Sequence, residues 1–88
     1  LLSYAKSFKL YSEAAVAGNR FAAEKLAVLY EHGLGTKRDL VEASRWYLRA
    51  ASQGSEEAKD NAERLHLVLD HAQWETAQRE AAMGGGKP

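Results

Sequence analysis

The sequence predicts an all-α fold built from stacked helical hairpins, and two observations lead to this prediction. First, the Ala-Ala pair, glycine and alanine at Ala14-Ala15, Gly18 and Ala22 recur 36 positions later as Ala50-Ala51, Gly54 and Ala58. Second, apolar residues recur at steps of three and four, the spacing of one helix face. A fixed period of this length is typical of repeats that bury their apolar faces only against neighbouring units. Function is therefore expected on an exposed surface rather than in an enclosed site.

The first two helices are predicted over residues 2–17 and 20–32. The first has an apolar stripe formed by Tyr4, Phe8, Tyr11 and Ala15. Gly18 ends it, because glycine tolerates the left-handed backbone found after many helices. Asn19 is expected to cap the second helix, whose inner side carries Ala22, Leu26, Leu29 and Tyr30.

The third helix is predicted over residues 40–53, after a turn at Gly33-Leu34-Gly35-Thr36. Asp39 followed by Glu42 resembles a capping box. The helix ends at Gly54, and Ser55 is expected to cap the next helix.

The fourth helix is expected to be about 25 residues long and to reach residue 83, because no helix breaker lies between Ala58 and Gly84. The repeat fails within it, since His66 stands at the position of Tyr30 and Leu69 at that of Gly33. An extended C-terminal capping helix is therefore predicted. The expected organisation is a single domain over residues 1–83, with a half repeat (2–18), a full repeat (19–54), a terminal half repeat with its capping helix (55–83) and a flexible tail (84–88).

Composition narrows the function classes. Among the 88 residues there is no cysteine, which excludes disulfides and thiolate sites. The formal net charge is zero, with eight Lys/Arg against five Asp/Glu in residues 1–50 and four against seven in residues 51–88. Nucleic-acid binding is not expected from so small and scattered a basic excess. No apolar stretch approaches the roughly 20 residues of a membrane span, so no membrane insertion of this segment is expected. The chain starts midway through a repeat, so a piece of a longer protein is expected, and its compartment stays open.

No catalytic, cofactor or metal site is predicted. His66 and Asp70 are one helical turn apart and His71 follows, but a pair supplies two ligands where a transition metal needs at least three. Gly33-x-Gly35 follows a helix and lacks the remaining residues of a phosphate-binding loop. Neither Ser44 nor Ser55 has the surroundings of a nucleophile.

The middle of the chain resembles the Sel-1-like repeat, a branch of the tetratricopeptide-type helical repeats. The resemblance depends on the segment from Leu26 to Gly35, then on Asp39, Ala43, Trp46-Tyr47, Ala50-Ala51, Gly54 and Ala58. Ala27 stands where the family prefers glycine, and Thr36 where it usually has valine. The resemblance implies a right-handed α/α superhelix and a non-catalytic scaffold, adaptor or signalling module. It also implies that the first helix of each unit lines a concave surface that binds a protein or peptide.

Candidate partner-binding residues are those that lie away from the apolar stripes of these first helices. In the second helix they are Glu24, Val28, Glu31 and His32, and in the fourth they are Asp60, Arg64 and Leu67. Trp74 either packs back as part of the cap or anchors another chain. Two alternatives stay open. The long helix, with a seam of Ala58, Ala62, Leu65, Leu69 and Ala72, could pair with a copy of itself as a homo-oligomer, or the segment could be a regulatory domain of a larger protein.

Overall fold

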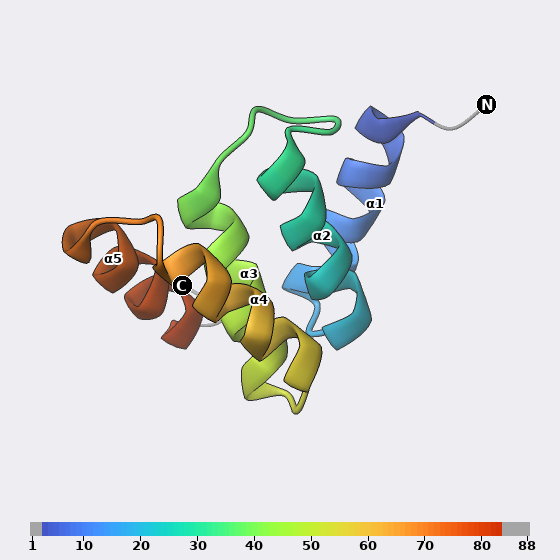
Figure 1. Cartoon of the computed structure of the whole chain (residues 1–88). Helices are drawn as coiled ribbons and strands as arrows, with labels where there is room; N and C mark the ends of the chain where they lie inside the picture. The colour runs from blue at the N-terminus through green and yellow to red at the C-terminus, as the bar shows by residue number, and fades with distance from the viewer. Residues whose placement is uncertain (1–2, 84–88) are drawn as a thin grey trace.

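Five α-helices follow one another along residues 3–83, the part of the chain that the computed structural model describes. Figure 1 shows them succeeding one another across the molecule, from α1 at one end to α5 at the other. Their bounds are Tyr4–Val16 (α1), Arg20–His32 (α2), Leu40–Ser52 (α3), Glu56–His66 (α4) and His71–Ala82 (α5). The predicted all-α helical repeat is confirmed. The predicted tail, residues 84–88, lies outside the described residues.

A side chain caps the start of each of these helices by accepting the N–H of the third helical residue. The caps are Ser3, Asn19, Asp39, Ser55 and Asp70. This confirms the capping roles predicted for Asn19, Asp39 and Ser55. The reciprocal half of the box predicted at Asp39 does not form, because the Glu42 carboxylate accepts from Arg45 at 3.1 Å instead.

Glycines have two different roles in the segments that connect the helices. Gly18 and Gly54, which end the repeat-related helices α1 and α3, both have a φ of 105°. This value confirms that the echo in the sequence is an echo in backbone conformation. Gly35 has a different role, because a Cβ at this position would collide with the backbone carbonyl of Tyr4. The loop between α2 and α3 therefore rests directly on the start of α1.

Close packing of small against large residues holds the helices together. α2 packs between α1 and α3, while α3 also packs against α4 and α5. The fully buried alanines at the contacts are Ala23, Ala27, Ala43 and Ala50, and the bulk between them comes from Leu26, Trp46 and Tyr47. Protein interiors are packed as densely as organic crystals, so enlarging one of these alanines would cost about 1–3 kcal/mol.

The prediction of one long C-terminal helix is wrong. α4 ends at His66, a short turn follows, and α5 begins at His71. Asp70 starts the new helix with a full capping box, in which its side chain accepts from the Gln73 N–H and the Gln73 side chain accepts from the Asp70 N–H. A helix can therefore end in a segment without glycine or proline, because this reciprocal pair satisfies two backbone N–H groups at the start of the next helix.

The break at residues 67–70 lets α5 fold back onto the stack. The Trp74 ring lies parallel to the His66 ring at 3.9 Å between centroids and 7° between planes, and Trp74 is only 9% exposed. Of its two predicted placements, Trp74 therefore adopts the one inside the cap. The seam predicted for self-association is divided between two helices, and Ala58, Ala62 and Leu65 are buried in the core. The continuous helix on which the predicted pairing of copies depends is therefore not formed.

Candidate protein-binding groove

A groove lies between α2 and α4, with α3 beneath it. It contains a hollow of ≈ 100 Å³. One wall comes from α2, the other from α4, and Tyr47 of α3 forms the floor. The lining residues are Glu24, Lys25, Val28, Tyr47, Glu57, Ala58 and Asn61. Because Tyr47 belongs to the hydrophobic core, the floor is formed by the fold itself before any partner arrives.

A direct contact between the two walls joins residues that are 33 positions apart. Glu31 of α2 contacts Arg64 of α4 directly. The same offset relates Val28 to Asn61 and Glu24 to Glu57, and all four of these residues line the hollow. We call these three pairs the rungs of the groove. In order they are two carboxylates (Glu24/Glu57), an apolar and a polar side chain (Val28/Asn61), and an ion pair (Glu31/Arg64).

The Glu31/Arg64 rung is part of a network that joins three helices. Arg64 donates from Nη1 to Glu31 Oε2 at 2.7 Å and from Nη2 to Oε1 at 3.0 Å. The buried Tyr47 hydroxyl donates to the same Oε1 at 2.9 Å. Two parallel bonds between a guanidinium and a carboxylate are among the stronger polar contacts in proteins. The network therefore fixes the spacing of α2 and α4 at this end of the groove.

The same contacts set the protonation of the network. The hydrogen bond from Arg64 lowers the pKa of Glu31, an effect that outweighs the opposing effect of burial. Burial raises the pKa of Tyr47, and its hydrogen bond to Glu31 raises it further. At neutral pH the network therefore consists of a carboxylate, a guanidinium and a neutral phenol, which is the state in which every bond described above can form.

The predicted partner-binding residues separate into three groups. Glu24 and Val28 line the groove. His32, Asp60 and Leu67 are exposed but lie outside its lining. The remaining three make contacts within the chain: Glu31 with Arg64, and Trp74 with His66. The placement of Glu31 on an exposed face is wrong, since it is only 7% exposed, whereas the Arg64 side chain is 52% exposed.

Five lining residues were not among the predicted partner-binding residues: Lys25, Tyr47, Glu57, Ala58 and Asn61. The comparison of α2 with α4 at an offset of 36 residues places Asp60 opposite Glu24, whereas the helices are staggered so that Glu57 takes that place. Tyr47 was interpreted as a core residue, which it is, but its edge also reaches the groove. A sequence signal for Glu57 and Asn61 exists only once the stagger is known.

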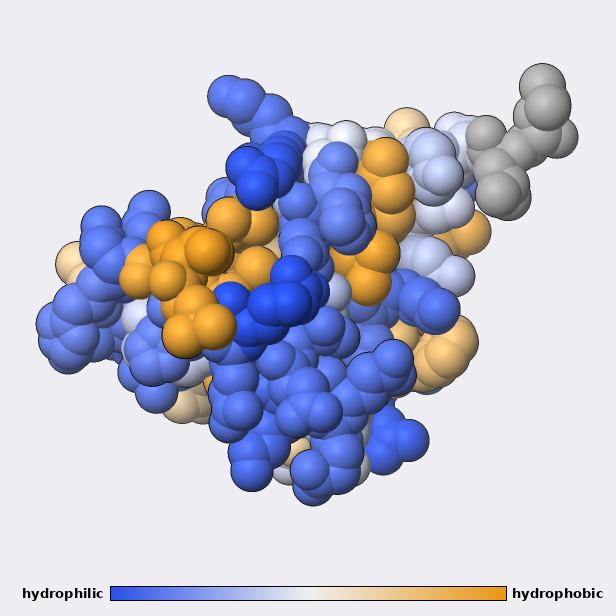
Figure 2. All heavy atoms as spheres, viewed as in Figure 1, coloured by the Kyte–Doolittle hydropathy of each residue, from blue (hydrophilic) through white to orange (hydrophobic). Residues whose placement is uncertain are grey.

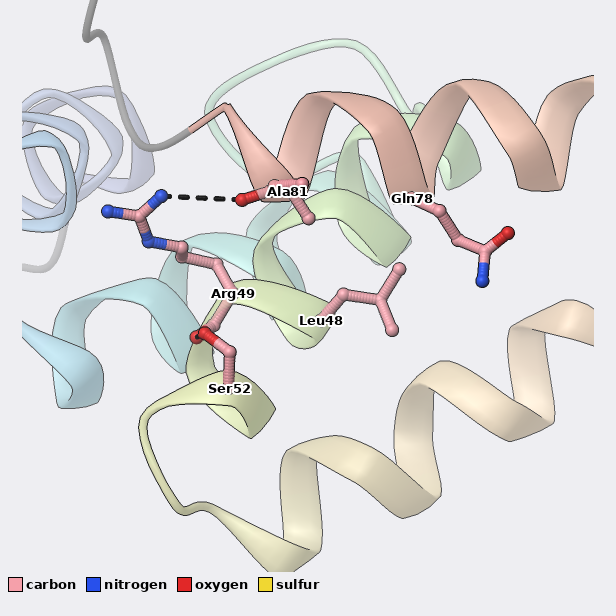
Figure 3. Close-up of a pocket in the computed structure, with 6 residues that line it drawn as sticks. Leu48, Arg49, Ser52, Gln78 and Ala81 are labelled. Carbon is pink, nitrogen blue, oxygen red and sulfur yellow. Dashed lines mark hydrogen bonds between the residues drawn. The ribbon is translucent and has the colours of Figure 1, made fainter.

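A second and larger hollow lies between α3 and α5, with a volume of ≈ 420 Å³. It is lined by Leu48, Arg49, Ser52, Gln78, Ala81 and Ala82. Figure 3 shows the Arg49 guanidinium donating to the Ala81 carbonyl, at 3.3 Å, which ties the end of α5 to α3. The Ser52 hydroxyl donates to the Arg49 carbonyl. These polar groups therefore already have partners within the chain.

The surface offers little for metal chemistry. Within residues 3–83, no three His, Asp or Glu side chains are placed to share a metal ion. His66 is stacked on Trp74, and His71 lies 3.3 Å from Glu75.

Figure 2 shows a mostly hydrophilic face, with hydrophobic side chains gathered over the turn between α4 and α5. Leu67 in this turn is 86% exposed.

No helix within the described part of the chain has the length and apolar character needed to cross a membrane.

Comparison with known proteins identifies the repeat. The sequence profile described as Sel1 repeat matches residues 3–19 and again residues 20–55, which together make up more than half of the chain. The second match contains α2 and α3 complete, and the first contains α1. No curated protein matches the chain. The chain belongs to the Sel1 repeat family, whose members are in general protein–protein interaction modules and typically non-catalytic scaffolds.

Proposed function

We propose that this domain is a non-catalytic scaffold that holds an extended segment of a partner protein in the groove between α2 and α4. The observation that carries the proposal is the hollow over Tyr47, which lies between the first helices of two successive units. Val28 is 37% exposed beside it, so the groove offers an apolar contact together with polar walls. A pre-formed surface of this kind loses little conformational entropy when a partner binds.

The Glu31/Arg64 network supports this proposal through rigidity. Of the eight residues proposed from the sequence, Glu24 and Val28 are the ones that we assign to direct contact. Glu31 and Arg64 are assigned to fixing the spacing between α2 and α4. Substituting all of them together would confuse a loss of contact with a loss of shape. The test therefore fills the groove at Asn61, whose Oδ1 accepts from Arg64 Nη2 at 3.1 Å, and leaves Glu31, Arg64 and Tyr47 unchanged.

The experiment uses a phage-displayed library of random twelve-residue peptides as the probe, selected on the unmodified chain. Binding of the enriched peptides is then measured by calorimetry with two variants. Asn61→Trp fills the groove, whereas Lys59→Trp adds the same bulk to an exposed position of α4 outside the lining. Filling the site is expected to weaken binding about tenfold or more, equivalent to the loss of about 1.4 kcal/mol, while Lys59→Trp changes it less than about twofold.

Circular dichroism and urea unfolding of both variants show whether the fold is retained. Equal affinity of the Asn61→Trp and Lys59→Trp variants for the enriched peptides would contradict the proposal, because binding would then occur on another surface.

A further inference from the structure

We propose that the groove recognises a cationic side chain, a lysine or arginine of the partner segment, at the Glu24/Glu57 rung. This inference rests on the proposed function and names the chemistry that the groove selects. It begins from a contrast between two rungs that share one geometry. Glu31 contacts a guanidinium 33 positions later, whereas the residue 33 positions after Glu24 is a second carboxylate, Glu57, which lines the same hollow.

In the described part of the chain, neither carboxylate forms an ion pair. Within residues 3–83, the side-chain ion pairs join Glu42 to Arg45, Glu31 to Arg64 and His71 to Glu75. Glu24 and Glu57 take part in none of them. Lys25 also lines the hollow, but its ammonium lies over the ring of Phe21, 5.1 Å from the centroid. Its ammonium therefore contacts an aromatic ring and forms no ion pair with either carboxylate.

The hollow between these carboxylates suits the shape of a long basic side chain. Its volume of ≈ 100 Å³ corresponds to roughly three water molecules, at about 30 Å³ each, which is room for a side chain but not for a whole small-molecule ligand. Val28, which is 37% exposed, provides carbon surface on which an aliphatic stem can lie, and the buried Tyr47 and Ala58 lie beneath the hollow. Lysine and arginine commonly bury such stems while their charged ends remain with polar groups.

Charge also decides against other occupants. An acidic peptide, a nucleic-acid backbone or an anionic lipid surface would bring further negative charge to two unpaired carboxylates, which is unfavourable at short range. A neutral segment would leave both carboxylates without a cation. The side chain that completes the rung is the one that Arg64 provides at the other end of the groove, a cation. The partner is thus a basic segment of a protein.

The test compares charge removal at the rung with charge removal elsewhere. The probe is again the set of peptides enriched from the random library on the unmodified chain. We expect lysine or arginine at a recurrent position in these peptides. The double variant Glu24→Gln/Glu57→Gln is expected to bind them about three- to tenfold more weakly, which corresponds to two partly exposed ion pairs. The matched control, Glu13→Gln/Glu63→Gln, removes the same net charge from exposed positions outside the lining and should bind with unchanged affinity.

A second measurement pairs each side of the contact. Replacing the recurrent lysine or arginine of a peptide by norleucine should weaken binding to the unmodified chain by a similar factor, and should weaken binding to the Glu24→Gln/Glu57→Gln variant no further. This non-additivity is the signature of a direct contact. Raising the salt concentration should reduce the difference between the two peptides.

The outcomes separate this inference from the proposed function. If enriched peptides lose affinity for the Asn61→Trp variant but lack a basic residue, or keep full affinity for the Glu24→Gln/Glu57→Gln variant, the groove binds peptides and the cationic inference is wrong. If neither variant affects binding, the proposed function fails and the inference fails with it.

Discussion

The two junctions at which a first helix passes into its second helix are built differently. At the α2–α3 junction, Tyr30 packs edge-on against Phe8 of α1, with ring centroids 5.3 Å apart and planes at 86°. At the α4–α5 junction, the repeat position of Tyr30 is His66, and its partner Trp74 comes from the following helix instead of the preceding one. The aromatic contact is kept, but its second ring arrives from the opposite direction along the chain.

The difference between the junctions involves two further residues, Ser44 of α3 and Trp74 of α5. Ser44 stands at the repeat position of Phe8 and is fully buried. Ser44 carries no ring, and at this junction the second ring is Trp74 of α5, a helix that packs against α3. The position that follows Tyr30 in the first unit and His66 in the last unit also differs. Glu31 is buried in an ion pair, whereas Leu67, its repeat equivalent, is 86% exposed. In the first of the two units, Glu31 of α2 forms an ion pair with Arg64 of α4. In the last unit, His66 of α4 instead stacks on Trp74 of α5, the helix that caps the stack.

The largest effect is expected from Trp74→Ala, which removes the ring that completes the second junction. Deleting a buried tryptophan side chain costs about 3–5 kcal/mol, and urea unfolding of the variant measures the loss. Phe8→Ala is the matched change at the first junction. It should cost less, because Phe8 is only half-buried. A larger loss for Phe8→Ala would mean that α1, and not α5, stabilises the stack most.

Glu31→Leu places the residue of the second junction into the first. The variant is expected to lose about 1–3 kcal/mol of unfolding free energy, because the buried Tyr47 hydroxyl is left without its acceptor. Tyr47→Phe in the same background should recover part of that loss, since it removes the unsatisfied group. An unchanged stability in Glu31→Leu would contradict the role given to the network.

Acid should weaken the Glu31 network at the first junction. The pKa of Glu31 is lowered in the folded chain, mainly by Arg64. Its contribution to stability is therefore present above the ordinary carboxyl pKa, near 4.5, and is lost as the pH falls through the folded value. Burial raises the pKa of Glu42, which acts in the opposite sense. The difference in stability between the unmodified chain and Glu31→Leu, followed from pH 6 down to pH 3 in urea, should cancel Glu42 and shrink with acid. A difference that stays constant would show that Glu31 does not act through its charge.

Asp70→Ala tests why the second junction exists at all. Losing this cap is expected to cost about 1 kcal/mol, and amide exchange should become faster in the first turn of α5. Asp60→Ala, at an exposed position within α4, is the control. If the variant instead gains helix by circular dichroism, α4 and α5 have merged, and the capping box alone kept them apart.

The smallest effect is expected from Leu67→Glu, which places the residue of the first junction into the second. Leu67 is exposed and has no buried contact to lose, so the unfolding free energy should change by less than about 0.5 kcal/mol. A gain well above this value would reveal a cation near position 67 that takes the part of Arg64.

Local signals in the sequence were sufficient for most of the fold. The periodicity of the apolar residues, the capping side chains at Asn19, Asp39 and Ser55, and the glycines at Gly18 and Gly54 each act within a few residues, so they can be recognised in the chain itself. The fourth helix was predicted too long because Asp70 and Gln73 were not recognised as a capping box. The spacing of Asp70 and Gln73 can be read in the sequence. The free energy gained by burying Trp74 against His66 cannot, because it depends on where α3 lies.

The groove was predicted less completely than the fold. Its location on the first helices of the units, and Glu24 and Val28 within it, followed from a family resemblance and from helical spacing. Glu57 and Asn61 did not, because the repeat length counts residues along the chain, whereas contacts between successive helices depend on how they are staggered in space. The Glu31/Arg64 contact shows a stagger of 33 residues, three fewer than the repeat.

By itself the sequence determined that this protein is a stack of α-helices with a 36-residue unit, since that outcome depends on local propensity and on the pattern of apolar residues. Only the tertiary structure decided which residues face one another across the groove, that Glu31 is buried, and that the chain turns at residue 67 to cap itself with α5. These features depend on packing between helices distant in sequence, where the relative placement of two surfaces determines the energy of each contact.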